Sequence, residues 1–116
     1  MTRRQKIGLW SVIGAALAIA PAIGVSAAAE DDGIVIVMKD NQFIPSEVPA
    51  PAGAKLKLVV RNQNPTVAEF ESSQFHREKV VQPGAEIVVF VGPLAPGSYE
   101  FFDDFHPSTR GHLVVK

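Results

Sequence analysis

The sequence contains no cysteine. This excludes disulfide bonds, zinc sites with Cys ligands, iron–sulfur clusters and thiol nucleophiles. A copper centre with a thiolate ligand is excluded for the same reason. Charged residues make up 20% of the chain, whereas hydrophobic residues make up 47%. Because this balance provides enough apolar surface to form a core, we expect a folded globular protein.

The chain also lacks a basic cluster. Lys and Arg number 11, against 12 Asp and Glu, and they are not interleaved with aromatic residues. Nucleic-acid binding requires a concentrated basic face that displaces counterions from phosphates, so the sequence predicts no nucleic-acid partner. A length of 116 residues allows one small domain and a short appendage.

Residues 1–29 have the layout of a secretory signal peptide. Three basic side chains stand at the start, an almost uncharged run covers 7–20, and small residues occupy 26–29. The alternative is an uncleaved membrane anchor, because residues 7–29 are nearly long enough to span a bilayer. We favour cleavage, because small residues stand at the positions that a signal peptidase reads.

Cleavage after residue 29 would leave a mildly acidic mature domain at residues 30–116. It removes three of the 11 basic side chains and none of the 12 acidic ones, which leaves 87 residues with a net charge of −4. The export signal predicts a periplasmic location. We expect the mature form not to be inserted in a membrane.

Apolar residues beyond Glu30 recur with a period near two, between Pro and Gly turns, and no stretch keeps helical spacing over three turns. This pattern predicts an all-β domain with seven or eight strands in a β-sandwich. The expected strands lie at 34–38, 43–48, 56–61, 68–72, 78–81, 86–91, 99–104 and 112–115. The expected core residues are Leu56, Leu58, Val60, Val89, Tyr99, Phe101, Leu113 and Val115.

Several segments resemble the cupredoxin family, and within it the EfeO-type cupredoxin-like domain of bacterial periplasmic iron-uptake systems. They are DNQFIPSEVPAPAG, LKLVVRNQNPTVAEFES, EKVVQPG, GPLAPGSYEFFDDFHP and RGHLVV. The resemblance covers nearly all of the mature chain. It implies a Greek-key β-sandwich, a metal site at one end of it, and two partners, a membrane iron permease and a companion periplasmic iron-uptake protein.

The family holds copper with a Cys in a Tyr-x-Phe-x-Cys pattern, a His a few residues on, a later Met and an earlier His. In this chain the pattern places Asp103 at the Cys position and His106 at the position of the following His. Arg110 or Gly111 stands where the Met would be. Ala68 or Glu69 takes the place of the earlier His. Without a thiolate, blue-copper electron transfer is excluded.

The resemblance implies that Glu69, Asp103 and His106 surround one metal ion, with Glu71, Asp104 and His112 as outer candidates. Carboxylates combined with imidazole suit ions such as Cu(II) and iron, so the expected cofactor is Cu(II) or Fe(II)/Fe(III). His76 lies in an expected surface loop and is interpreted as an ordinary solvated histidine.

A simpler interpretation of the acidic residues stands beside this one. Asp103 and Asp104 would form a polar turn, and Glu69 with Glu71 would form a solvated strand face. Alternation argues against it at one position, because Asp103 points the same way as Tyr99 and Phe101, which are expected inside. A buried carboxylate there needs a cation or hydrogen-bond donors.

Two functions remain open. The first is a periplasmic copper- or iron-binding protein that assists iron uptake together with a membrane permease. The second is a structural or partner-binding β-sandwich with a decayed copper site. An enzyme is not expected, because the sequence has no Ser/His/Asp nucleophile arrangement and no phosphate-binding glycine loop.

Overall fold

The computed structural model describes residues 33–116, so the predicted signal peptide lies outside the described residues. Gly33–Lys116 is a compact unit of nine β-strands. The strands are β1 (Ile34–Lys39), β2 (Gln42–Ile44), β3 (Glu47–Ala50), β4 (Leu56–Asn62), β5 (Ala68–Ser72), β6 (Arg77–Val81), β7 (Glu86–Val91), β8 (Gly97–Asp103) and β9 (His106–Val115). Within this unit no helix is long and apolar enough to cross a membrane.

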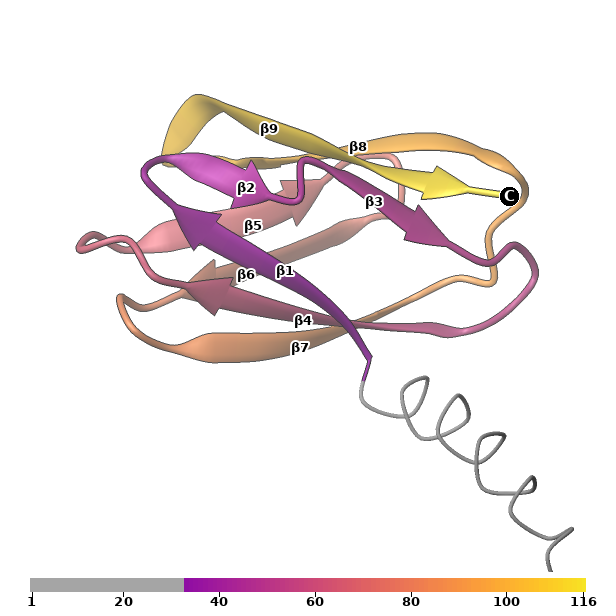
Figure 1. Cartoon of the computed structure of the whole chain (residues 1–116), viewed down its shortest axis with the longest axis horizontal. Helices are drawn as coiled ribbons and strands as arrows, with labels where there is room; N and C mark the ends of the chain where they lie inside the picture. Colours follow the sequence, from indigo (N-terminus) through magenta and orange to yellow (C-terminus); the bar gives the residue numbers. More distant parts are fainter. Residues whose placement is uncertain (1–32) are drawn as a thin grey trace, which may run out of the picture. The chain divides into compact units, whose positions relative to one another are not determined.

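The strands form two sheets that pack face to face (Figure 1). One sheet has the order β2-β1-β4-β7, and the other has the order β3-β9-β8-β5-β6. The β1–β4 and β3–β9 pairs are parallel and the remaining pairs are antiparallel. The predicted all-β, two-sheet sandwich is therefore confirmed.

The expected number of seven or eight strands is wrong, because the segment expected as one strand at 43–48 is two. The chain leaves the first sheet after Ile44, where β2 ends, and β3 joins β9 in the other sheet. Pro45 stands between the two strands and has no N–H to donate to a ladder, so pairing stops there. The short crossover adds a strand to each sheet.

The core between the sheets contains the residues that alternation selects. Seven of the eight expected core residues are buried, and Tyr99 is half-buried, packs against the core and donates its hydroxyl to the Ala95 carbonyl at 2.8 Å. The core contains an aromatic group, in which the Phe101 ring is 4.8 Å from that of Phe43 and 5.3 Å from that of Phe70. Such aromatic packing stabilises the sandwich near the end where β8 turns into β9.

Candidate functional site

Asp103, which aligns with the cupredoxin cysteine, is a buried carboxylate at the end of the sandwich where β8 turns into β9. Its residue is 1% exposed. Oδ1 accepts hydrogen bonds from the main-chain N–H groups of Glu69 at 2.9 Å and Phe105 at 3.0 Å. Oδ2 lies 2.8 Å from Nδ1 of His106. The prediction that Asp103 points inward is confirmed, and hydrogen bonds within the chain satisfy both of its oxygens.

A second set of buried polar residues closes the same end. Asn62 Nδ2 donates to two main-chain carbonyls, at 2.9 and 3.0 Å, and Asn62 Oδ1 accepts from the Asn64 N–H at 2.9 Å. Asn64 Oδ1 accepts from the Asn41 N–H at 3.2 Å, and Thr109 donates its hydroxyl to the Asn41 carbonyl at 2.8 Å. The sequence analysis missed these residues. Asn near the end of a strand is a common turn residue, so the sequence does not show that it is buried and hydrogen-bonded.

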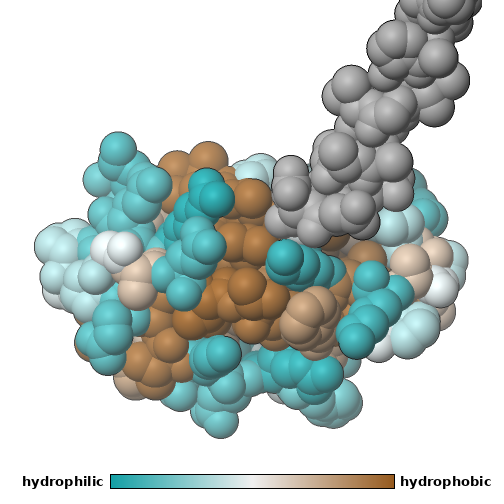
Figure 2. All heavy atoms as spheres, turned by 90° about the horizontal axis from the view of Figure 1, so that it is seen from below, coloured by the Kyte–Doolittle hydropathy of each residue, from teal (hydrophilic) through white to brown (hydrophobic). Residues whose placement is uncertain are grey.

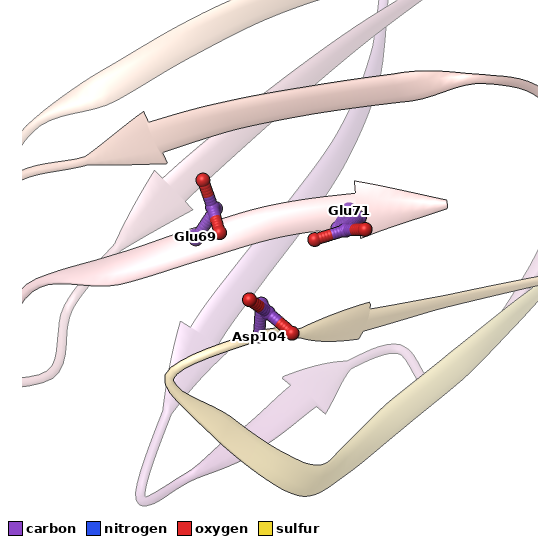
Figure 3. Close-up of side chains that lie close together, drawn as sticks. All are labelled: Glu69, Glu71 and Asp104. Atoms are coloured by element: carbon purple, nitrogen blue, oxygen red, sulfur yellow. The ribbon is translucent and has the colours of Figure 1, made fainter. Parts of the chain in front are cut away.

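Three carboxylates gather on the outer face of the five-stranded sheet (Figure 3). Glu69 and Glu71 lie two residues apart on β5, so they project to the same face, and Asp104 follows the last residue of β8. One oxygen from each lies within 4.8 Å of the others. The Asp104 N–H donates to the Glu69 carbonyl at 2.9 Å, which fixes the two main chains against each other.

The surroundings of the cluster raise the pKa values of two of its carboxyl groups. Desolvation, followed by the charge of Glu78 and by hydrogen bonding and repulsion from Asp104, raises the pKa of Glu69 above 4.5. Desolvation and the charges of Asp104 and Glu78 likewise raise the pKa of Glu71. Glu78 belongs to this surface because it pairs with Glu71 across the β5–β6 hairpin. Only the hairpin register reveals Glu78, which the sequence analysis did not select.

The histidines among the predicted ligands lie apart from this cluster. The His106 ring pairs with Asp103 and its side chain is 37% exposed. His112 lies on β9, with Nε2 3.9 Å from Glu100 Oε2, and Arg110 binds the other oxygen of Glu100 at 2.8 Å. The six predicted ligands therefore form three groups, and the structure joins three of them, Glu69, Glu71 and Asp104, in one cluster.

The positions aligned with the family's remaining copper ligands have other roles. Ala68 is buried in the core. The Arg110 guanidinium lies 5.0 Å from the centre of the Phe102 ring, which is half-buried. Gly111 allows a close approach, because a Cβ there would meet Phe101 Cε1 at 2.6 Å. None of these side chains offers copper a sulfur or imidazole ligand.

The residues present therefore do not fit a blue-copper ion. Such a site needs a thiolate and two imidazoles, and here a carboxylate occupied by protein donors stands at the thiolate position. The carboxylate cluster presents oxygen ligands, which suit hard and borderline cations. The chemistry that this end supports is cation binding by oxygen.

Solved structures of several other proteins have a similar fold. The metal-binding domain of a Cu(I)-exporting P-type ATPase from Streptococcus pneumoniae matches with a TM-score of 0.66 and 16% identity, covering 72% of this chain and 83% of that one. A purple cupredoxin from Nitrosopumilus maritimus matches with a TM-score of 0.59 and 16% identity, covering 72% and 99%. A mutant of amicyanin in its reduced Cu(I) form matches with a TM-score of 0.63 and 14% identity, covering 78% and 89%. These likenesses show the fold.

Sequence comparisons identify the family. An uncharacterized protein of Rickettsia prowazekii (strain Madrid E) is 42% identical over 83 residues, which cover 71% of this chain and 66% of that protein. The chain thus spans just under two thirds of the length of this relative. The family model of the cupredoxin-like domain matches residues 9–115. Together with the two-sheet sandwich, this match shows that the chain belongs to the cupredoxin-like domain family.

Proposed function

We propose that the protein is an exported, periplasmic cupredoxin-like protein that binds Cu(II) or iron through carboxylates in place of the family's thiolate. The observation that carries the proposal is the approach of Glu69, Glu71 and Asp104 to within 4.8 Å of one another on one face. Like charges at this separation repel one another, and a cation removes the repulsion. Desolvation, followed by the repulsion of neighbouring carboxylates, raises the pKa values of Glu69 and Glu71.

Asp103 lies on the buried side of the sheet, where it positions the proposed ligands without binding the ion itself. Its Oδ1 accepts the Glu69 N–H, and the next residue, Asp104, donates its own N–H back to Glu69. These two bonds hold a carboxylate of β5 and a carboxylate of the β8–β9 turn at a fixed separation. The arrangement matches the way in which residues behind metal ligands orient them in metalloproteins.

Oxygen ligands favour a hard ion. Cu(I) prefers thiolate and thioether ligands, and the only methionine of residues 33–116, Met38, is buried in the core. Fe(III), Fe(II) and Cu(II) all accept carboxylates, with Cu(II) favoured in affinity by the Irving–Williams order. We propose iron as the biological ion, on the resemblance to EfeO-type domains, with a membrane iron permease and a companion periplasmic protein as partners.

A metal titration with matched variants tests the proposal. The purified protein is titrated with Cu(II), with Fe(II) under anaerobic conditions and with Fe(III) supplied as a chelate. We expect Glu71→Gln and Asp104→Asn each to lower the affinity by about tenfold or more, because each removes an ionised ligand. Glu86→Gln is the control, since Glu86 is held by Arg61 at 2.8 Å in the other sheet.

The pH dependence gives a second check. Protons compete with the ion for the same oxygens, so affinity should fall on acidification through the raised pKa values of Glu69 and Glu71. Binding that Glu71→Gln and Asp104→Asn leave unchanged would contradict the site. Export is tested separately by mass spectrometry of the secreted protein, which should begin between Ala28 and Glu30.

A structural or partner-binding sandwich with a decayed copper site is the second candidate. The observation that favours it is the complete hydrogen bonding of Asp103, since the former ligand position is stabilised without an ion. This candidate predicts that the wild type binds none of the three ions. It also predicts that a chelator leaves the melting temperature unchanged.

A further inference from the structure

A polar pocket lies at the side of the sandwich where β2 of one sheet meets β9 of the other (Figure 1). Its volume is about 310 Å³, at the small end of the roughly 300–1,000 Å³ that is typical of small-molecule sites. Its polar lining contrasts with the side of the sandwich seen in Figure 2, where hydrophobic residues form a broad area. The carboxylate cluster contributes no residue to the pocket, so this is a separate candidate site.

The pocket opens where β9 extends beyond its partner β3. β3 begins at Glu47, opposite His112, so the earlier part of β9 has no partner strand on that side. The His112 N–H points to that side and donates to the Ser46 carbonyl at 2.8 Å. Because the main-chain groups of successive strand residues point alternately to the two sides, those of Ser108 and Arg110 point toward the pocket that they line.

Hydrogen bonds hold the walls of the pocket in place. Asn41, in the turn between β1 and β2, donates its N–H to Asn64 Oδ1 at 3.2 Å. Its carbonyl accepts the Thr109 hydroxyl at 2.8 Å. Thr109 is buried, so this contact joins β9 to the turn from the inner side of the strand. The shape of the pocket is therefore set before a ligand binds, which reduces the ordering cost of binding.

The lining offers neutral side chains that both donate and accept hydrogen bonds. They are the amides of Asn41 and Gln42 and the hydroxyls of Ser46 and Ser108. Within residues 33–116 none of these four side chains is hydrogen-bonded to another residue, since Asn41 uses only its main chain. Phe43 is the apolar residue of the lining, but it is only 3% exposed, so an apolar ligand would find little surface.

The charge of the lining is already balanced. Arg110 is the charged residue that the described part of the chain places in the pocket wall, and its Nη1 donates to Glu100 Oε1 at 2.8 Å. The guanidinium also lies 5.0 Å from the centre of the Phe102 ring on the outer face of the sheet. A bound anion would have to compete with Glu100 for this cation, whereas a neutral ligand would not. The lining therefore favours a neutral ligand that carries several polar groups.

We propose that this pocket binds one ring of a neutral saccharide. Sugar hydroxyls both donate and accept hydrogen bonds, as do the side chains of Asn41, Gln42 and Ser108. The N–H groups of Ser108 and Arg110 add donors from the open strand edge. This function goes beyond metal binding and uses none of the proposed cation ligands.

An NMR titration of the isotope-labelled, metal-free protein tests the proposal. The full chain is expressed, and its processed form is purified. The probes are glucose and N-acetylglucosamine as neutral sugars, glucuronate as the charged counterpart of glucose, and sulfate as a simple anion. We expect a neutral sugar at millimolar concentration to shift the amide signals of Asn41, Gln42, Ser108 and Arg110. Glucuronate should bind no more tightly than glucose.

Matched variants locate the contact. Gln42→Ala and Ser108→Ala should each weaken sugar binding about three- to tenfold, because each removes hydrogen bonds to the ligand. The controls Gln82→Ala and Ser98→Ala remove the same groups from exposed residues outside the lining and should bind as the wild type does. Asn41→Gly should also weaken binding, and it keeps the turn, because glycine readily adopts the φ of 57° found at Asn41.

Three results would overturn the proposal. The first is no selective shift of the lining signals in the wild type with either neutral sugar. The second is a shift with glucuronate or sulfate but not with the neutral sugars, which would make the pocket an anion site. The third is equal weakening in Gln42→Ala and Gln82→Ala. Glu71→Gln, the variant used for the metal titration, should leave sugar binding intact, so the two proposals fail independently.

Discussion

Replacing Asp103 tests how this end of the sandwich is held together. Asp103→Ala leaves the N–H groups of Glu69 and Phe105 and the ring of His106 without their acceptor. A buried polar group that loses its partner costs about 1–3 kcal/mol, so we expect the free energy of unfolding to fall by about 3–5 kcal/mol. That is a large share of the roughly 5–15 kcal/mol that stabilises a typical domain.

Asp103→Asn separates the hydrogen bonds from the charge. The amide oxygen still accepts the two main-chain N–H groups, and the amide nitrogen can donate to a neutral His106 ring, so the expected loss is only about 1–2 kcal/mol. Urea unfolding of the metal-free protein, followed by circular dichroism at neutral pH, measures both losses. Glu47→Gln is the control, because Glu47 is exposed and lies outside the carboxylate cluster.

A loss below about 1 kcal/mol in Asp103→Ala would refute the reasoning, since removing a buried acceptor of three hydrogen bonds must cost more than this. Equal losses in Asp103→Ala and Asp103→Asn would refute it too. A residue kept solely as a metal ligand would behave differently. Its removal would leave the metal-free protein equally stable or more stable, and only the metal affinity would fall.

Two further predictions concern the surface cluster and the core. The pKa values of Glu69 and Glu71 are raised above 4.5, so the protonated form is favoured in the folded state, and this stability is present below the ordinary pKa and lost as the pH rises through the raised one. Glu71→Gln should therefore stabilise the metal-free protein against urea at neutral pH, by an amount that vanishes near pH 4; destabilisation at neutral pH would contradict the repulsion. Gly111→Ala should lower the free energy of unfolding by about 1–3 kcal/mol, because its Cβ would lie 2.6 Å from a ring carbon of Phe101. In thermal unfolding Gly97→Ala, where the nearest atom is 3.6 Å away, should match the wild type, and equal behaviour of the two variants would contradict the close approach.

Alternation in the sequence predicted most of the sandwich. Leu56, Leu58 and Val60 alternate with a mixed set of residues that includes Lys57 and Arg61, and the structure buries all three. The extra strand was missed because composition alone does not show that the chain changes sheets at Pro45. Tertiary pairing, rather than local preference, decides that crossover.

Alternation also predicted the direction of Asp103 but could not predict its partners. The Glu69 N–H is 34 residues away in sequence, and the contact depends on the register of β5 against β8. That register pairs Asp103 with the buried Phe70, so Glu69, one residue earlier, faces outward. Because neighbouring side chains on a strand point to opposite faces, the Glu69 carboxylate lies on the outer face of the sheet and the Asp103 carboxylate on the inner face.

Paramagnetic broadening in the NMR spectrum tests the proposed metal site most directly. A small fraction of an equivalent of Cu(II) is added to the isotope-labelled protein, and the loss of each amide signal is mapped on the sandwich. We predict that the losses centre on Glu69, Glu71 and Asp104, with the amide of His112 unaffected by comparison, and that Glu71→Gln weakens them. Losses centred on His106 or His112, or no selective loss, would contradict the carboxylate site.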